Sequence, residues 1–146
     1  MNFMNLPAEY ASEKSKFVVL PLSYEKDLTY LTGCSKGPAE IIKASNELEY
    51  YDEQFKAEPF EDGIFLAETL KLSDLIPEDA MKAIQTRAED FSEKFVVGLG
   101  GDHAVTHGLI AALEKKHDDF SVVILDAHSD MRDSWKSQLN HACVSK

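Results

Sequence analysis

Three potential metal ligands follow one apolar run at every second position. The stretch "LDAHSDMRD" covers residues 125–133 and carries Asp126, His128 and Asp130. In an extended chain these side chains would share one face, but at ~3.3 Å per residue they would spread over roughly 13 Å. One ion cannot contact ligands so far apart unless the chain bends, whereas two ions ~3.5–4 Å apart use such a spread better.

A second polar group follows another apolar run, where "GLGGDH" ends on Asp102 and His103. Imidazole and carboxylate groups without a thiolate favour a hard or borderline divalent ion such as Mn²⁺ over a structural zinc. Carboxylates after a fully apolar run must be paired, protonated or metal-bound if they are buried. We therefore interpret these residues as a metal site. Asp102 has two interpretations, because it could orient His103 or cap the turn.

The elements that must position these residues are short apolar strands. Continuous apolar runs predict strands over residues 16–22, 94–100 and 120–128, with a weaker candidate at 63–68. Runs that do not alternate with polar residues are typical of parallel strands covered on both faces.

Helical segments are expected between the strands, over residues 37–51, 76–94 and 106–119. Two of them open on a proline, and Thr106 is a capping candidate for the third. The alternation predicts an α/β fold with a parallel sheet in a single domain. Both polar groups then fall at the carboxyl ends of strands, where such sheets bind ligands.

Composition limits the classes of partner. The chain has 146 residues, 44% of them hydrophobic, and its net charge is −11, with 15 Lys and Arg against 26 Asp and Glu. An acidic surface argues against nucleic-acid binding, and no apolar run approaches the ~20 residues of a membrane span. The two cysteines, Cys34 and Cys143, predict no disulfide and suit a reduced, cytoplasmic protein.

Four stretches together resemble the ureohydrolase family, the arginases and agmatinases. "GGDHAVT" at 100–106 and "DAHSD" at 126–130 resemble two signature motifs, and "GCSKGPAEI" at 33–41 resembles a segment near the start of such proteins. "DMRDSWKSQLNHACV" at 130–144 is more similar to agmatinases. The resemblance implies a three-layer αβα, arginase-like fold, incomplete here, with residues 1–146 forming the amino-terminal part of one ureohydrolase domain.

The resemblance also implies a site with two Mn²⁺ ions. His103 and Asp130 would bind one ion, His128 the other, and Asp126 would bridge them. The ions would generate hydroxide that attacks a guanidinium carbon, with His141 carrying protons and Asp130 counted with it as catalytic. A small cationic guanidino substrate is expected; agmatine would give putrescine and urea. The family resemblance further suggests a homo-oligomer.

Two alternatives to an agmatinase stay open. Ureohydrolases usually run to about twice this length and carry a later Ser-x-Asp-x-Asp-x-x-Asp-Pro pattern, which this sequence lacks. The chain could therefore be a non-catalytic, truncated α/β fragment without the later ligand aspartates. Alternatively, the substrate could be another compound, such as guanidinobutyrate or formiminoglutamate. Because the later part of the domain would supply further strands and helices, we expect an uncovered sheet edge and uncovered apolar faces.

Overall fold

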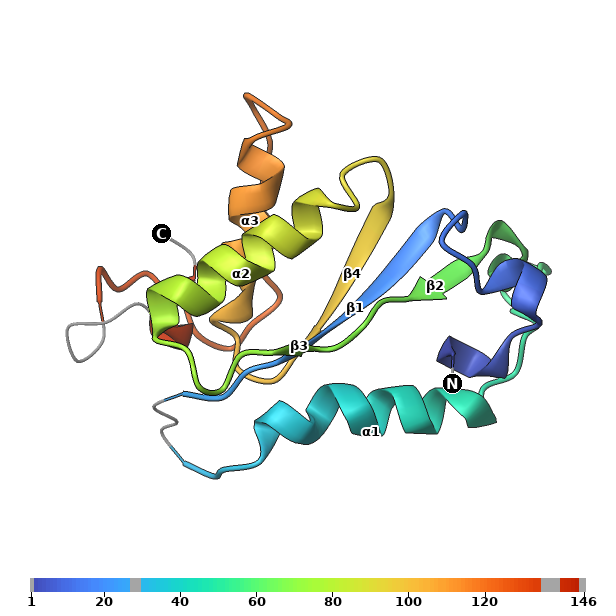
Figure 1. Ribbon diagram of the computed structural model, residues 1–146, viewed down its shortest axis with the longest axis horizontal. Coiled ribbons are helices and arrows are strands. Elements are labelled where there is room, and N and C mark those ends of the chain that lie inside the picture. The colour runs from blue at the N-terminus through green and yellow to red at the C-terminus, as the bar shows by residue number, and fades with distance from the viewer. Residues whose placement is uncertain (1, 27–29, 135–139, 145–146) are drawn as a thin grey trace.

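A parallel sheet lies between helices on both of its faces in the computed structural model, which describes residues 2–26, 30–134 and 140–144 (Figure 1). This arrangement confirms the predicted three-layer α/β class. The elements of the sheet and its layers are β1 (Phe17–Ser23), α1 (Gly37–Ala44), β2 (Ile64–Leu66), β3 (Leu70–Lys71), α2 (Pro77–Glu89), β4 (Phe95–Gly100) and α3 (Val105–Glu114).

Strand β1 is the centre of the sheet. Val18 pairs with Phe65 of β2 on one side and with Val96 of β4 on the other. Leu22 in turn pairs with β3 and β4, so β2 and β3 occupy successive parts of one edge of β1. Five consecutive residues of β1, 18–22, are buried. The predictions of strands at 16–22, 63–68 and 94–100 are confirmed with small shifts of their ends.

Helix α2 shows why a three- and four-residue spacing of apolar positions specifies a buried face. Ala80, Met81, Ile84 and Ala88 all pack into the core formed with β1. Helix α3 approaches α2 closely at Gly108, where an added Cβ would stand 2.6 Å from the Met81 carbonyl oxygen. A side chain at that position would push the two helices apart.

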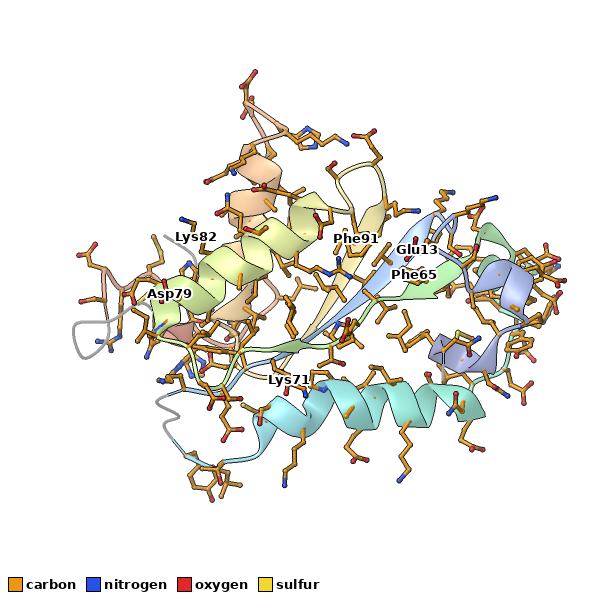
Figure 2. All side chains as sticks on the ribbon, in the orientation of Figure 1. Glu13, Phe65, Lys71, Asp79, Lys82 and Phe91 are labelled. Carbon is orange, nitrogen blue, oxygen red and sulfur yellow. The ribbon has the colours of Figure 1, made fainter. Side chains whose placement is uncertain are left out.

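The end of α2 is fixed by an aromatic side chain. Phe91 is buried just beyond the helix, and its ring lies 6.1 Å from the Phe65 ring of β2, centroid to centroid (Figure 2). Asp79 and Lys82 are exposed on the solvent side of the helix. The helix predicted over 76–94 is therefore present but ends earlier, at Glu89.

Helix α1 is also shorter than the predicted 37–51. It ends at Ala44, and one further turn of 3₁₀ helix reaches Glu47. Ser45 is buried, donates its hydroxyl to the Ile42 carbonyl at 2.7 Å and accepts the Met4 N–H at 2.9 Å. A side chain that bonds local backbone competes with continued helix, and the sequence pattern did not reveal this partner.

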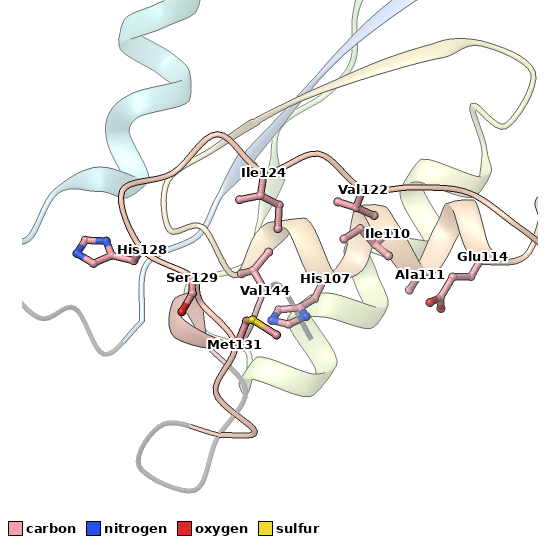
Figure 3. A pocket seen from close by; sticks show the side chains of 10 residues that line it. All are labelled: His107, Ile110, Ala111, Glu114, Val122, Ile124, His128, Ser129, Met131 and Val144. Carbon is pink, nitrogen blue, oxygen red and sulfur yellow. The ribbon is translucent and has the colours of Figure 1, made fainter.

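The strand predicted over 120–128 is wrong. The segment has no strand assignment, and Val123 and Leu125 are 81% and 95% exposed. It passes along α3, separated from Ile110 and Ala111 by a cavity of about 530 Å³ (Figure 3). A strand needs ladder hydrogen bonds from a neighbour, and a segment beside a helix receives none. The outer edge of β4 has no partner strand among the described residues.

Cys34 and Cys143 are both free thiols. Within residues 2–26, 30–134 and 140–144, no helix is long and apolar enough to cross a membrane.

Candidate metal centre

A tight turn after β4 delivers His103. Asp102 is 4% exposed, and its Oδ1 accepts the Ala104 N–H at 2.9 Å. Asp102 thus caps the turn, which is one of its two interpretations from the sequence. Thr106 was wrongly predicted as the cap, because α3 already begins at Val105 and Thr106 lies within its first turn.

The chain bends where the second group of ligands lies. Bends occur at residues 127–128, and the His128 N–H donates to Asp126 Oδ1 at 2.8 Å. Asp130 follows with φ = 44°, a left-handed conformation that is uncommon outside glycine. The hydrogen bond from the His128 N–H is the main cause of a lowered pKa of the Asp126 carboxyl. The bend removes the spread of ligands that a straight strand would impose.

Three of the predicted ligands converge. His103 Nδ1 lies 3.2 Å from Asp130 Oδ2 and 3.5 Å from Asp126 Oδ2. One ligand atom from each residue lies within 4.8 Å of the other two. Their side chains are partly sheltered, and that of Asp130 is only 12% exposed. A cluster of one imidazole and two carboxylates, so spaced, fits a single divalent ion of the hard or borderline class.

His128 lies outside this cluster. Its side chain is 82% exposed, and its Nδ1 is 3.4 Å from Asp126 Oδ1. The two oxygens of Asp126 therefore face two different imidazoles, Oδ2 toward His103 and Oδ1 toward His128. This arrangement is compatible with the bridging role predicted for Asp126, and that role stays a prediction.

The family is decided by a match along most of the chain. The model of the arginase family matches residues 15–146. The chain belongs to the arginase family. It is 41% identical over 138 residues to an N(1)-aminopropylagmatine ureohydrolase of Synechocystis sp., covering 88% of this chain and 45% of that protein. It is 31% identical over 139 residues to an agmatinase of Bacillus cereus, covering 89% of this chain and 46% of that protein.

Solved structures agree with this assignment. The agmatine ureohydrolase of Thermoplasma volcanium superimposes with a TM-score of 0.84 at 27% identity, covering 94% of this chain and 47% of that one. The arginase fold predicted from the motifs is confirmed. This arginase-family chain spans about 45% of the length of the curated relatives it matches.

His141, the predicted proton carrier of the arginase-family site, lies beside the cluster. Together with His128 and Asp130 it lines a cavity of about 610 Å³. Two hydrogen bonds fix the backbone of the next residue, Ala142: Asn140 Oδ1 accepts its N–H at 2.9 Å, and the Arg132 N–H donates to its carbonyl at 3.1 Å. The His141 Nδ1 atom is buried without a hydrogen-bond partner among the described residues. Its catalytic role, and that of Asp130, stay predictions.

His107 lies on α3 four residues after His103, and the sequence offered no role for it. It is half-buried, and its Nε2 lies 3.4 Å from the Asn140 carbonyl oxygen. Burial is the main cause of its lowered pKa. His107 thus links α3 to the segment that carries His141. His117, which was expected on the same helix, lies beyond its end.

Proposed function

We propose that this chain carries part of the metal centre of an agmatinase-like hydrolase, which cleaves a guanidino compound to an amine and urea. The observation that carries the proposal is the convergence of His103, Asp126 and Asp130 at one edge of the sheet in an arginase-family chain. With agmatine as substrate, the products would be putrescine and urea, a step of polyamine synthesis.

The donor set supports manganese as the metal. Neutral imidazole and carboxylate oxygen suit Mn²⁺, and no cysteine sulfur belongs to the cluster. Two such ions, when bound, would make hydroxide available near neutral pH. Asp126 would contribute to holding both ions, His103 and Asp130 would hold one, and His128 would hold the other. His141 lines the cavity beside the cluster, and from that position it would take up and release protons.

A second substrate is favoured by one specific observation. The relative named for N(1)-aminopropylagmatine is 41% identical to this chain, whereas the Bacillus cereus agmatinase is 31% identical. Both substrates carry a guanidinium group, so the same metal centre would serve either. They differ in the amine chain attached to it, and discrimination would therefore come from contacts outside the cluster.

The experiment measures urea release by the chain loaded with Mn²⁺, offered agmatine, N(1)-aminopropylagmatine and guanidinobutyrate in turn, and formamide release when formiminoglutamate is offered. Asp126→Asn removes the bridging carboxylate, and Asp118→Asn makes the same change at an exposed position as a control. We expect urea from the first two substrates, lost in Asp126→Asn and retained in Asp118→Asn. Mn²⁺ binding without turnover of any substrate would favour the alternative of a non-catalytic fragment.

The remaining predictions concern the whole protein. We propose a cytoplasmic homo-oligomer that binds neither nucleic acid nor membranes, in which residues 1–146 are the amino-terminal part of a single domain. Sedimentation analysis of the protein with and without Mn²⁺ tests the oligomer.

A further inference from the structure

Residues 33–35, which lie just before α1, are tied to one carboxylate. Glu25 accepts the Gly33 N–H on both oxygens, at 2.9 and 2.8 Å, and the Ser35 N–H on Oε2 at 2.9 Å. Gly33 has φ = 109°, a conformation that only glycine adopts readily, and it turns its N–H toward the carboxylate. The backbone N–H groups of Ser35 and Gly33 hold the pKa of Glu25 at about 2.

The tied segment packs directly against the turn after β4. A Cβ added to Gly101 would overlap the Tyr24 carbonyl oxygen and stand 2.8 Å from that of Cys34. The Asp102 N–H donates to the same Tyr24 carbonyl at 3.0 Å. Tyr24, next to Glu25, and Cys34, between Gly33 and Ser35, therefore enclose the backbone of Gly101 and Asp102. This backbone immediately precedes His103.

The Cys34 side chain reports on this packing. Burial, followed by the hydrogen bond and charge of Glu25, raises the pKa of its thiol to about 11. Asp102 adds a smaller contribution of the same sign. The thiol is thus sensitive both to the carboxylate that ties the segment and to the turn on which the segment rests.

We propose that Glu25 is a positioning residue for the metal centre: by holding Gly33–Ser35 against Gly101, it fixes the backbone that presents His103 to Asp126 and Asp130. The inference rests on the proposed function, since it takes His103 as a ligand. Glu25 touches neither the cluster nor the substrate, and it acts through the turn. Without the carboxylate, the N–H groups of Gly33 and Ser35 lose their acceptor, and the Ser23 hydroxyl, which donates to the Ser35 carbonyl at 2.7 Å, is left to tie these residues to β1. The turn after β4 is then held less firmly.

The test compares Glu25→Gln with Glu40→Gln, which removes the same charge from an exposed position on α1. In Glu25→Gln we expect faster amide exchange at Gly33 and Ser35 and a shifted imidazole NMR signal of His103 in the metal-free protein. We expect the Mn²⁺ dissociation constant to rise about tenfold, the lower end of what loss of a ligand-orienting partner costs. Glu40→Gln should change none of these.

A thiol titration, made where each variant is shown to be folded, checks the contact between Glu25 and Cys34. The midpoint of Cys34 alkylation against pH should fall below about 11 in folded Glu25→Gln protein, and it should stay in place in Glu40→Gln. An unchanged His103 signal in Glu25→Gln, with exchange at Gly33 and Ser35 accelerated, would overturn the inference. If the unmodified protein binds no Mn²⁺, the proposed function fails, and the His103 signal still decides the role of Glu25.

Discussion

Two apolar runs of similar composition lie in contrasting surroundings. "KFVVGLG" at 94–100 contributes β4, which pairs with β1 along six residues. "FSVVILD" at 120–126 pairs with no strand, and its Leu125 is almost fully exposed. The first run has a neighbour on the sheet, whereas the second lies beside a helix across a cavity. Strand formation in this chain is therefore decided by an available partner as much as by the run itself.

The two regions also make different contributions: the first mainly stabilises the fold, and the second supplies most of the proposed metal ligands. β1 supplies buried residues at the centre of the core, its neighbour β4 packs against that core through Val96, and the turn after β4 presents one ligand, His103. The second run contributes little buried surface, but the bend after it presents the carboxylates of Asp126 and Asp130. The cluster is thus assembled from one support that pairs with the sheet and one that is largely exposed.

The largest expected effect is a difference in the free energy of unfolding between two variants, in which the same Leu→Ala truncation is made in each region. Leu20→Ala removes a fully buried side chain from β1 and should lower the free energy of unfolding by about 2–5 kcal/mol. Leu125→Ala removes a side chain that is 95% exposed and should change it by less than about 0.5 kcal/mol. Urea denaturation measures both. Equal losses would show that residues 120–126 are packed in solution as firmly as β1.

The second expected effect is on metal binding, and it comes from a substitution in the second region that should leave stability nearly unchanged. Asp130→Asn should weaken Mn²⁺ binding on the order of tenfold or more. Loss of a residue that only orients a metal ligand already weakens binding by about that factor, and Asp130 is itself a proposed ligand. The free energy of unfolding without metal should stay nearly unchanged. Titration calorimetry and urea denaturation provide the two measurements, with Asp118→Asn as the matched control. A large loss of stability in Asp130→Asn would contradict the division between the regions.

The smallest expected effect is on the stability of the folded protein at acidic pH. The pKa of Glu25 is lowered from 4.5 to about 2 in the folded protein, so its ionised form favours folding. Its contribution to stability is complete above pH 4.5 and is lost as pH falls toward 2. Glu25→Gln should therefore flatten the dependence of the urea midpoint on pH within that window and leave its slope at neutral pH unchanged. An identical acid profile in the variant would mean that the carboxylate is not held as described.

The sequence predicted the parts of the fold that follow from local patterns. Continuous apolar runs found β1 and β4, and the helical segment predicted over 76–94 found α2, whose Met81, Ile84 and Ala88 are buried. The run at 120–128 misled because periodicity describes a segment and carries no information about its partner. Helix ends were misjudged for a similar reason, since the contact of Ser45 with Met4 spans 41 positions.

The sequence predicted the ligand residues of the candidate site, but it did not predict the contacts that hold them in place. Residue type and spacing found His103, Asp126 and Asp130, because chemistry restricts which side chains can bind a metal. The bend that brings them together depends on the Asp126 contact with the His128 N–H and on the φ of Asp130, neither of which follows from alternation. Glu25 was missed entirely. Its only signal was a carboxylate eight residues before a glycine, a separation too common to notice.

The pairing of β1 has a consequence for how the chain is made. β1 ends at Ser23, yet the strand that pairs with six of its seven residues, β4, ends at Gly100. During synthesis on the ribosome, β2 and β3 can pair with one edge of β1 once Lys71 has left the exit tunnel, but the other edge must wait until Gly100 has left it. At ~5–20 residues per second this interval lasts several seconds, which is ample time for a chaperone to bind. One edge of the most deeply buried strand of the finished fold thus stays without its partner on the nascent chain until β4 follows.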